Sequence, residues 1–300
     1  HVMVVGARGN EESEPAIDVF WTTGEEHIKV PLPPAFELAR FVPGRDDVVM
    51  VAHGVPDEDS TRIVFSPPSG EEPLEHTLDV RADGLSVDWS PDGRHAVVRS
   101  SDGQARVLAL TETAGIQRQA RFDGVEDSAF LDDSTVMLVD GVRLRVVELD
   151  GRVRATMLHD APVDGWRPTS SGERIVSWTG AGVHVWRRDG TLLGDTVTGH
   201  SIRGVSSRDG GRRLLVVTDA GIELHEMWGR PEGALLRLDA PVRHFEFSPD
   251  SKKLVAASES GTIFGSRLDG SEPESLTADE RILSLRHADD EVELLTRGDN

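Results

Sequence analysis

The sequence predicts an all-β fold built from repeated four-stranded antiparallel sheets. Three observations support this prediction. Hydrophobic residues alternate in short runs, Gly and Asp mark turns between the runs, and certain turn glycines recur at a nearly regular spacing. Within residues 183–221, for example, the runs VHVW and RLLVV are separated by turns that close on glycine. Tight turns can join antiparallel strands, whereas parallel strands need long crossover connections.

Seven glycines mark the register of the repeat, each at the turn between the third and fourth strand of a unit. Neighbouring members of this set are 36 to 46 residues apart. We expect these turns to need a positive φ angle, which glycine adopts readily. About seven repeats of this length form one closed ring, so we predict a β-propeller as a single domain over residues 1–300. The seven are Gly24, Gly70, Gly115, Gly151, Gly190, Gly229 and Gly270.

The innermost strand of each predicted blade can be located independently of the glycines. Two of these strands run into turns of the type SPDG, namely WSPDG at 89–93 and FSPDS at 247–251. A hydrophobic second strand follows most of them, for example HAVVRS and RLLVV. The predicted inner strands are 35–41, 84–89, 124–130, 162–166, 201–205, 241–247 and 281–285.

The two ends of the chain are expected to close the ring. Residues 2–26 align with 49–72, so they hold the last three strands of a unit, and 281–285 would supply the missing inner strand. Such pairing of the N- and C-terminal strands removes open sheet edges. The run EVELLT at 291–296 competes with 2–6 for one position, so it lies outside the ring or begins a further repeat. We predict seven blades, with eight as the alternative, in a fragment of a longer protein.

Composition excludes several classes of function. The formal net charge is −21, which repels nucleic acid and anionic membranes and favours a basic protein partner. The absence of cysteine excludes disulfides, thiolate catalysis and Cys-ligated zinc. No apolar run approaches the ~20 residues of a membrane-spanning helix. The Arg-rich composition without Tyr or Cys indicates a bacterial protein, which we expect in the cytoplasm.

Motifs for catalysis are absent from the sequence. It contains no GxxxxGK phosphate loop, no GxSxG nucleophile elbow and no HExxH zinc motif. The acidic residues at 132, 133 and 140 lack the glycine and final glutamate of a calcium loop. We therefore predict no catalytic site, no cofactor and no metal site.

Repeat motifs resemble those of bacterial WD40 proteins over essentially the whole chain, in a degenerate form. In the sixth unit, Gly199-His200 and Asp219 match the His and Asp of the WD40 repeat, and His225 stands where Trp is usual. The resemblance implies a structural hydrogen-bond network, whose members here would be His200, Asp219, Trp186 and Asp102. It also implies a protein-interaction or sensing scaffold, often the recognition domain of a larger protein with an effector domain.

Acidic residues recur in the connections from one unit to the next, which in a propeller line one mouth of the central channel. Each Asp either caps its own turn or contributes to an acidic mouth that receives a basic peptide. Two acidic loops, 10–15 and 56–60, would extend this mouth or simply be solvated. The candidate residues are Asp83, Asp123, Asp160, His200, Asp239 and Asp279.

A second candidate contact is Trp228 in the turn MWGRPEG, beside Arg230. Trp and Arg are enriched at interface hot spots, although this Trp could also fold back over its own blade. The other strand tryptophans, at 89, 166, 178 and 186, are expected in the core. We predict a non-catalytic interaction module. The alternative is a propeller with a small-molecule or metal site in its channel, as in an enzyme or a peptidase gate.

Overall fold

The computed structural model describes most of the chain and divides it into two compact units, His1–Thr156 and Met157–Asn300, which are described separately below. The described residues are 2–6, 16–20, 27–31, 36–43, 45–55, 58–66, 73–81, 83–111, 115–169, 172–208, 213–226, 231–237, 242–247, 253–258, 260–267, 274–277, 281–288 and 291–297.

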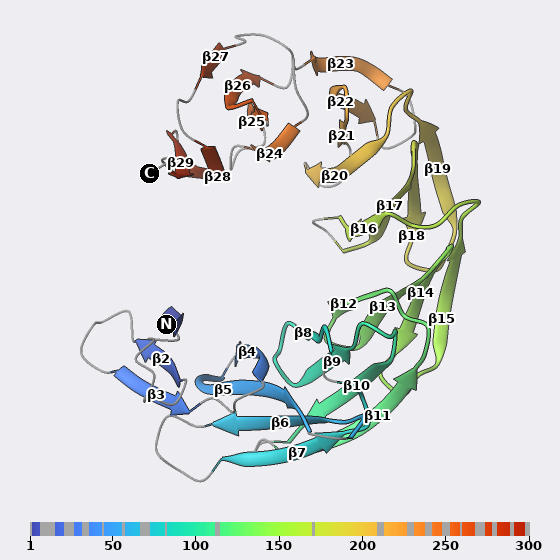
Figure 1. The fold of residues 1–300 in the computed structure, drawn as a ribbon. Helices are drawn as coiled ribbons and strands as arrows, with labels where there is room; N and C mark the ends of the chain where they lie inside the picture. Colours follow the sequence, from blue (N-terminus) through green and yellow to red (C-terminus); the bar gives the residue numbers. More distant parts are fainter. Residues whose placement is uncertain are drawn as a thin grey trace. The chain divides into compact units, whose positions relative to one another are not determined.

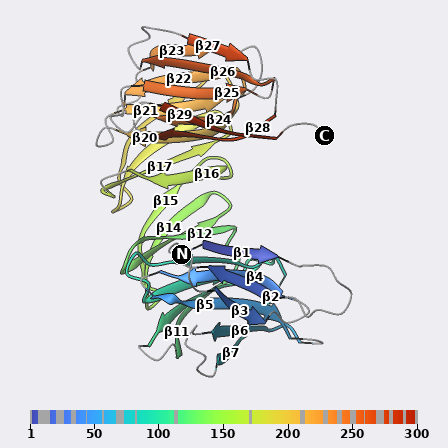
Figure 2. The ribbon, with the colours of Figure 1, turned by 90° about the vertical axis from the view of Figure 1, so that its left-hand side faces the viewer.

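Throughout these residues the secondary structure is β-strand (Figures 1 and 2). Six sheets have four antiparallel strands in sequence order. The first three are β4(Phe36–Val42), β5(Arg45–Gly54), β6(Thr61–Ser66), β7(Leu74–Leu78); β8(Ser86–Trp89), β9(His95–Arg99), β10(Ala105–Leu110), β11(Ile116–Phe122); and β12(Asp127–Asp132), β13(Thr135–Asp140), β14(Arg143–Glu148), β15(Val153–Leu158).

The next three four-stranded sheets repeat this order. They are β16(Gly165–Pro168), β17(Arg174–Thr179), β18(Gly182–Arg187), β19(Leu192–Val197); β20(Ile202–Arg208), β21(Arg213–Thr218), β22(Gly221–Glu226), β23(Pro231–Arg237); and β24(Val242–Phe247), β25(Lys253–Ser258), β26(Thr262–Arg267), β27(Glu274–Thr277). Two smaller sheets are β1(Val2–Gly6), β2(Ala16–Phe20), β3(His27–Pro31) and β28(Arg281–Ala288), β29(Glu291–Arg297).

The predicted all-β fold of four-stranded antiparallel units is therefore confirmed. All seven predicted inner strands are observed, although β12 begins at Asp127 and β16 at Gly165, three residues later than expected. The residues before them belong to connections instead, where for example Val125 N donates to Gly103 O at 2.9 Å. Residues 2–31 supply three strands of one sheet, as predicted.

The expected partner of β28 requires a correction. From the sequence we predicted that residues 281–285 pair with Val2–Gly6 and close a ring. In the structure, β28 instead pairs with β29 along almost its whole length. EVELLT therefore occupies the second-strand position that it was predicted to compete for. Only two residues separate β28 from β29, so this pairing closes a very short loop at little cost in chain entropy. The blade number stays a prediction.

The register glycines are placed as expected where the structure describes them. Gly115, Gly151 and Gly190 each lie between a third and a fourth strand. The φ angles of Gly151 and Gly190 are 94° and 89°, in the left-handed region that favours glycine. Gly115 does not lie in this region; its N–H donates to the Thr111 hydroxyl instead. The other four, Gly24, Gly70, Gly229 and Gly270, lie outside the described residues.

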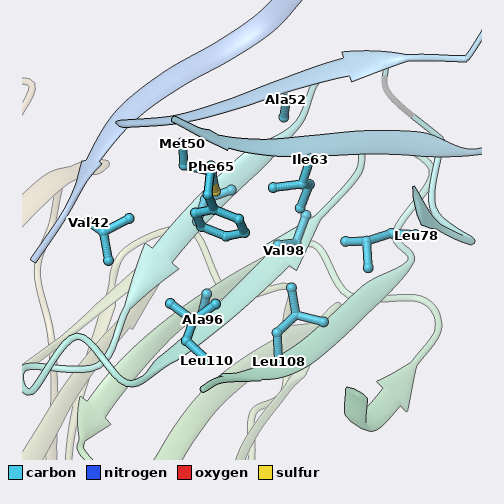
Figure 3. Packing of buried hydrophobic residues seen from close by; sticks show 11 residues of the cluster. Val42, Met50, Ala52, Ile63, Phe65, Leu78, Ala96, Val98, Leu108 and Leu110 are labelled. Carbon is cyan, nitrogen blue, oxygen red and sulfur yellow. The ribbon is translucent and has the colours of Figure 1, made fainter. Parts of the chain in front are cut away.

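In unit 1, the sheets bury apolar side chains on both faces. Figure 3 shows the cluster between the β4–β7 and β8–β11 sheets, where Phe65 and Ile63 face Leu108 and Val98. The opposite face of the β8–β11 sheet packs Val97 and other apolar residues against the β12–β15 sheet. Strands buried on both faces explain why their sequences are continuous hydrophobic runs.

In unit 2, β21 shows this two-sided burial residue by residue. Leu214 and Val216 belong to the cluster shared with the β16–β19 sheet. Leu215 and Val217 belong to the cluster shared with the β24–β27 sheet. Alternate residues of a strand point to opposite faces, so this one strand contributes to two cores.

Turns on one side of unit 1 also join neighbouring sheets. Gly93, in the predicted SPDG turn, has a φ of 67° and lies so close to Pro43 that a Cβ atom there would be 1.8 Å from the Pro43 carbonyl oxygen. The carboxylate of Asp133 accepts a hydrogen bond from Asp92 N at 2.8 Å. Asp88 on β8 accepts one from Phe130 N on β12 at 2.6 Å. The sheets of this unit are therefore joined by polar as well as apolar contacts.

Candidate interaction face

The candidate residues that the structure describes, Asp83, Asp123, Asp160 and His200, lie in connections, the segments that lead from the fourth strand of one sheet to the first strand of the next. In unit 1 these connections lie beside hairpin turns between second and third strands. Asp83 O accepts a hydrogen bond from Ser101 N at 3.0 Å, and the Asp83 carboxylate accepts one from the Ser101 hydroxyl at 3.3 Å. Connections and hairpin turns thus share one side of the sheets, which we call the turn face.

Acidic and basic side chains alternate on the turn face of unit 1. Asp123 is exposed and pairs with Arg121 at 3.3 Å. Arg81 pairs with Asp59, which belongs to the predicted acidic loop 56–60, at 3.1 Å. Both pairs are exposed to solvent, so each contributes little to stability. Their carboxylates remain accessible to a partner.

Asp102 sits in the hairpin turn between β9 and β10. The Ser100 hydroxyl donates a hydrogen bond to its carboxylate, and this bond is the main reason why the pKa of Asp102 is lowered. Gln104 donates from its backbone N–H and its side-chain amide, at 3.2 and 3.1 Å, and the nearby charge of Arg81 acts in the same direction. Asp102 therefore closes a turn and stays ionised.

In unit 2 the same arrangement surrounds the hairpin turn between β17 and β18. The Asp164 carboxylate accepts a hydrogen bond from Gly180 N. On the other side of the turn, Ile202 N donates to Gly180 O at 2.8 Å. The connections that carry Asp160 and His200 are therefore both anchored to one turn, and Asp160 is exposed.

A buried hydrogen-bond network in unit 2 joins the connection before β16 to the strands β17 and β18. Ser177 on β17 accepts a hydrogen bond from Trp186 Nε1 at 2.9 Å, and its hydroxyl lies 2.7 Å from His159 Nε2. All three side chains are buried, and the rings of His159 and Trp186 meet edge-on, 5.2 Å apart. This network holds the connection after β15 against β17 and β18.

Sequence reasoning assigned Trp186 to such a network but missed His159 and Ser177. Part of the signal was present, because a histidine stands in each connection, although His159 directly follows β15 and His200 lies three residues beyond the end of β19. The remaining member is Ser177 on the second strand, β17, which lies opposite His184 of the third strand, β18, in the strand register.

The predicted pair of His200 and Asp219 is brought together in the next sheet, with Nδ1 and Oδ1 3.7 Å apart. Both side chains are exposed, by 50% and 42%. His225, in the position expected for Trp, is buried and its Nε2 lies 2.9 Å from Glu223 Oε2. His225 is thus separate from the His200–Asp219 pair.

Two histidines of unit 2 lie side by side near the exposed Asp160. The rings of His159 and His184 are 5.0 Å apart and nearly perpendicular. Partial burial lowers the pKa of His184, while the charges of Asp195 and Asp160 act against this change. His184 is therefore neutral at pH 7, with two carboxylates close enough to affect it.

Part of the predicted interaction surface lies in segments that the structure does not describe. Asp239, Asp279, Trp228, Arg230 and the acidic loop 10–15 lie outside the described residues.

Within the described part, no three His, Asp or Glu side chains gather as metal ligands would. The same residues contain no helix that could span a membrane. Of the strand tryptophans, Trp178 and Trp186 are buried in the core, and Trp89 packs partly buried against it.

Comparison with known proteins supports the architecture. No protein-family model matches the sequence, and no curated protein matches it. Among solved structures, the chain is similar to the WD40 protein Sqt1 from Chaetomium thermophilum. The TM-score is 0.64 over 84% of this chain and 74% of that chain, at 15% identity. The fold is that of a β-propeller. At this identity the likeness concerns the fold alone, which hosts many functions.

Proposed function

We propose that the chain is a non-catalytic protein-interaction module that docks a basic partner on the turn faces of its two units. The observation that carries this proposal is the anchoring of the connections. Hydrogen bonds hold the connections that bear Asp83, Asp160 and His200 against hairpin turns: from Ser101 N to Asp83 O, from Gly180 N to the Asp164 carboxylate, and from Ile202 N to Gly180 O. Anchored loops on packed sheets present side chains in fixed positions, which lowers the entropy lost on binding.

Charge supports a basic partner. The net charge of −21 attracts cationic proteins, and most of the predicted contact residues are acids. Exposed carboxylates steer a basic surface into contact and speed association, and this effect weakens with salt. The exposed ion pairs of unit 1, such as Asp123 with Arg121, would exchange their arginine for one of the partner at little cost.

In this proposal the module is the recognition or sensing part of a larger bacterial protein in the cytoplasm, and an effector domain in the same parent chain is a second candidate partner. The resemblance to WD40 repeats supports this setting. The alternative, an enzyme-like site for a small molecule or metal in a central channel, also stays a prediction. No contact among the described residues favours it over docking.

The test is affinity capture with the full-length parent protein, followed by identification of the partner by mass spectrometry. The purified partner is then titrated against a variant with Asp123, Asp160 and Asp239 all changed to Lys. We expect binding to be lost in this variant and to weaken with salt in the unchanged protein.

The matched control changes Asp150, Asp189 and Asp269 to Lys, which alters the net charge equally. Asp150 and Asp189 lie at third-to-fourth strand turns, away from the turn face, and Asp269 precedes the predicted register glycine Gly270. We expect the control to keep most of the affinity. Equal binding by both triple variants would overturn the proposal.

A further inference from the structure

The outer edge of β19 is an open strand edge in unit 2. β19 is the last strand of its sheet, and β18 is its neighbour among the described residues. A register shift opposite Val185 and Trp186 accommodates Leu193, and the pairing is regular from Gly194 to Val197. The unpaired N–H and C=O groups of such an edge are a template for another strand.

Side chains along this edge protect it only weakly, since Asp195 is its one charge. Natural edge strands are commonly blocked by charged side chains, especially Lys, by Pro or by inward-pointing charges. The edge strand β11 carries the exposed Arg121, whereas Leu192–Val197 has no Lys, Arg or Pro. Val197 is instead 76% exposed and Leu192 is 45% exposed.

Leu192, Asp195 and Val197 lie on one face of β19, the face of His184. His184 lies directly across the β18–β19 pairing from Asp195, and Leu192 and Val197 pair with Trp186 and Gly182 on the same face. The His159 ring lies beside His184. The charges of Asp160 and Asp195 both act on His184. This patch thus has two exposed apolar side chains, Leu192 and Val197, with Asp195 between them and Asp160 near it.

This composition selects the occupant. A second copy of the chain is disfavoured, because two molecules of charge −21 repel each other and would bring Asp195 against like charge. A strand that alternates apolar and basic residues fits: the apolar side chains cover Leu192 and Val197, and an Arg lies between the carboxylates.

We propose that an extended basic segment of a partner protein adds as a strand to the free edge of β19, with an Arg between Asp160 and Asp195. This inference rests on the proposed function and specifies where and in which conformation the partner binds. Main-chain hydrogen bonds to Gly194–Val197 supply affinity, and the patch supplies specificity.

The experiment measures fluorescence anisotropy of a labelled peptide, acetyl-Val-Arg-Val-Arg-Val amide, titrated with the protein at low salt. We expect saturable binding that weakens at least tenfold in Val197→Arg and severalfold in Asp195→Asn. The matched control is Leu276→Arg on the edge strand β27, where the side chain is 65% exposed. This variant should bind within twofold of the unchanged protein. Circular dichroism checks that all variants are folded.

Two altered peptides test the mode of binding. Replacing both Arg by Glu should abolish binding, and methylating alternate backbone nitrogens should do the same if a strand is added. Binding of the methylated peptide, absence of binding by the parent peptide, or equal loss in Leu276→Arg would each overturn the β19 site.

The proposed function is tested separately, because Val197→Arg and Asp195→Asn leave every connection acid intact. If the captured partner is lost by the triple variant of Asp123, Asp160 and Asp239 but kept by these two variants, the turn face stands and the β19 site is overturned. If the partner is kept by all of them, both proposals are overturned.

Discussion

The β16–β19 and β20–β23 sheets each follow a connection that carries a histidine, and only one of the two histidines is buried. His159 directly follows β15, whereas His200 lies three residues beyond the end of β19, where Thr198 takes the position of His159. Before β16, His159 is buried against Ser177 and Trp186. Before β20, His200 is exposed beside Asp219. At the positions of Ser177 and Trp186 in this second sheet are Val216 and His225.

The comparison shows what accompanies the burial of a connection histidine. A buried imidazole needs hydrogen-bond partners, and Ser177 supplies one to His159. Val216 offers none to the corresponding connection, where Thr198 stands at the position of His159, and His200, two residues further on, is exposed beside Asp219. In the β20–β23 sheet, Asp219 is present without the Ser and Trp, and its pair with His200 is exposed. In the β16–β19 sheet, Ser177 and Trp186 form a buried network with His159, and no Asp stands at the corresponding turn.

The largest effect should come from Trp186→Ala. The indole fills a buried position and donates to Ser177, so we expect the free energy of unfolding to fall by about 3–5 kcal/mol in urea denaturation. Trp186→Phe keeps most of the apolar volume and should lose clearly less. Equal losses in the two variants would contradict the importance of the ring volume.

A reciprocal exchange of Ser177 and Val216 sharpens the comparison. Ser177→Val removes the oxygen shared by His159 and Trp186, and we expect a loss of about 1–3 kcal/mol in urea denaturation. Val216→Ser places a hydroxyl in the apolar cluster between two sheets and should also destabilise, by a similar amount. If Val216→Ser stabilised the protein, the new hydroxyl would have found a hydrogen-bond partner, which would contradict the expectation that a serine there is buried without one.

A smaller effect should depend on pH through His184. Partial burial places its folded-state pKa below the ordinary value of 6.5, so the unfolded chain binds a proton more readily. Stability should therefore fall as the pH drops through about 6.5, and level off below the folded-state pKa. Urea denaturation at pH 7.5 and 5.5 should show a smaller loss for His184→Gln than for the unchanged protein. An equal or larger loss in the variant would contradict this.

The smallest effect should come from His200→Ala. The His200–Asp219 pair is exposed on both sides, so removing it should change the free energy of unfolding by about 0–1 kcal/mol. The same measurement on His159→Ala, where the ring is buried, should give a clearly larger loss. Comparable losses at the two positions would remove the distinction between the sheets.

Sequence reasoning located the strands well, because glycine turns and hydrophobic runs are local signals. The inner strands at 84–89 and 241–247, for example, are observed as β8 and β24. It assigned β28 the wrong neighbour, since a pairing partner depends on competition between distant segments. It found His200 and Asp219 but not Ser177, because a lone Ser in a hydrophobic run has no signature until the strand register is known. The open edge of β19 is likewise visible only once the sheet order is known.

The two-sided burial of β21 has a consequence for how its alignment with β22 is fixed. Leu214 and Val216 face one neighbouring sheet while Leu215 and Val217 face the other, so both faces of the strand are apolar. A shift of the register by one residue would exchange the two faces without exposing these apolar side chains, so the hydrophobic pattern alone does not fix the register. The hairpin must do so instead: Thr218 Oγ1 donates to Gly221 O at 3.1 Å, and Gly221 has a φ of 144°. The four turn residues 218–221 thereby fix the register of β21 and so determine which of its leucines packs against which neighbouring sheet.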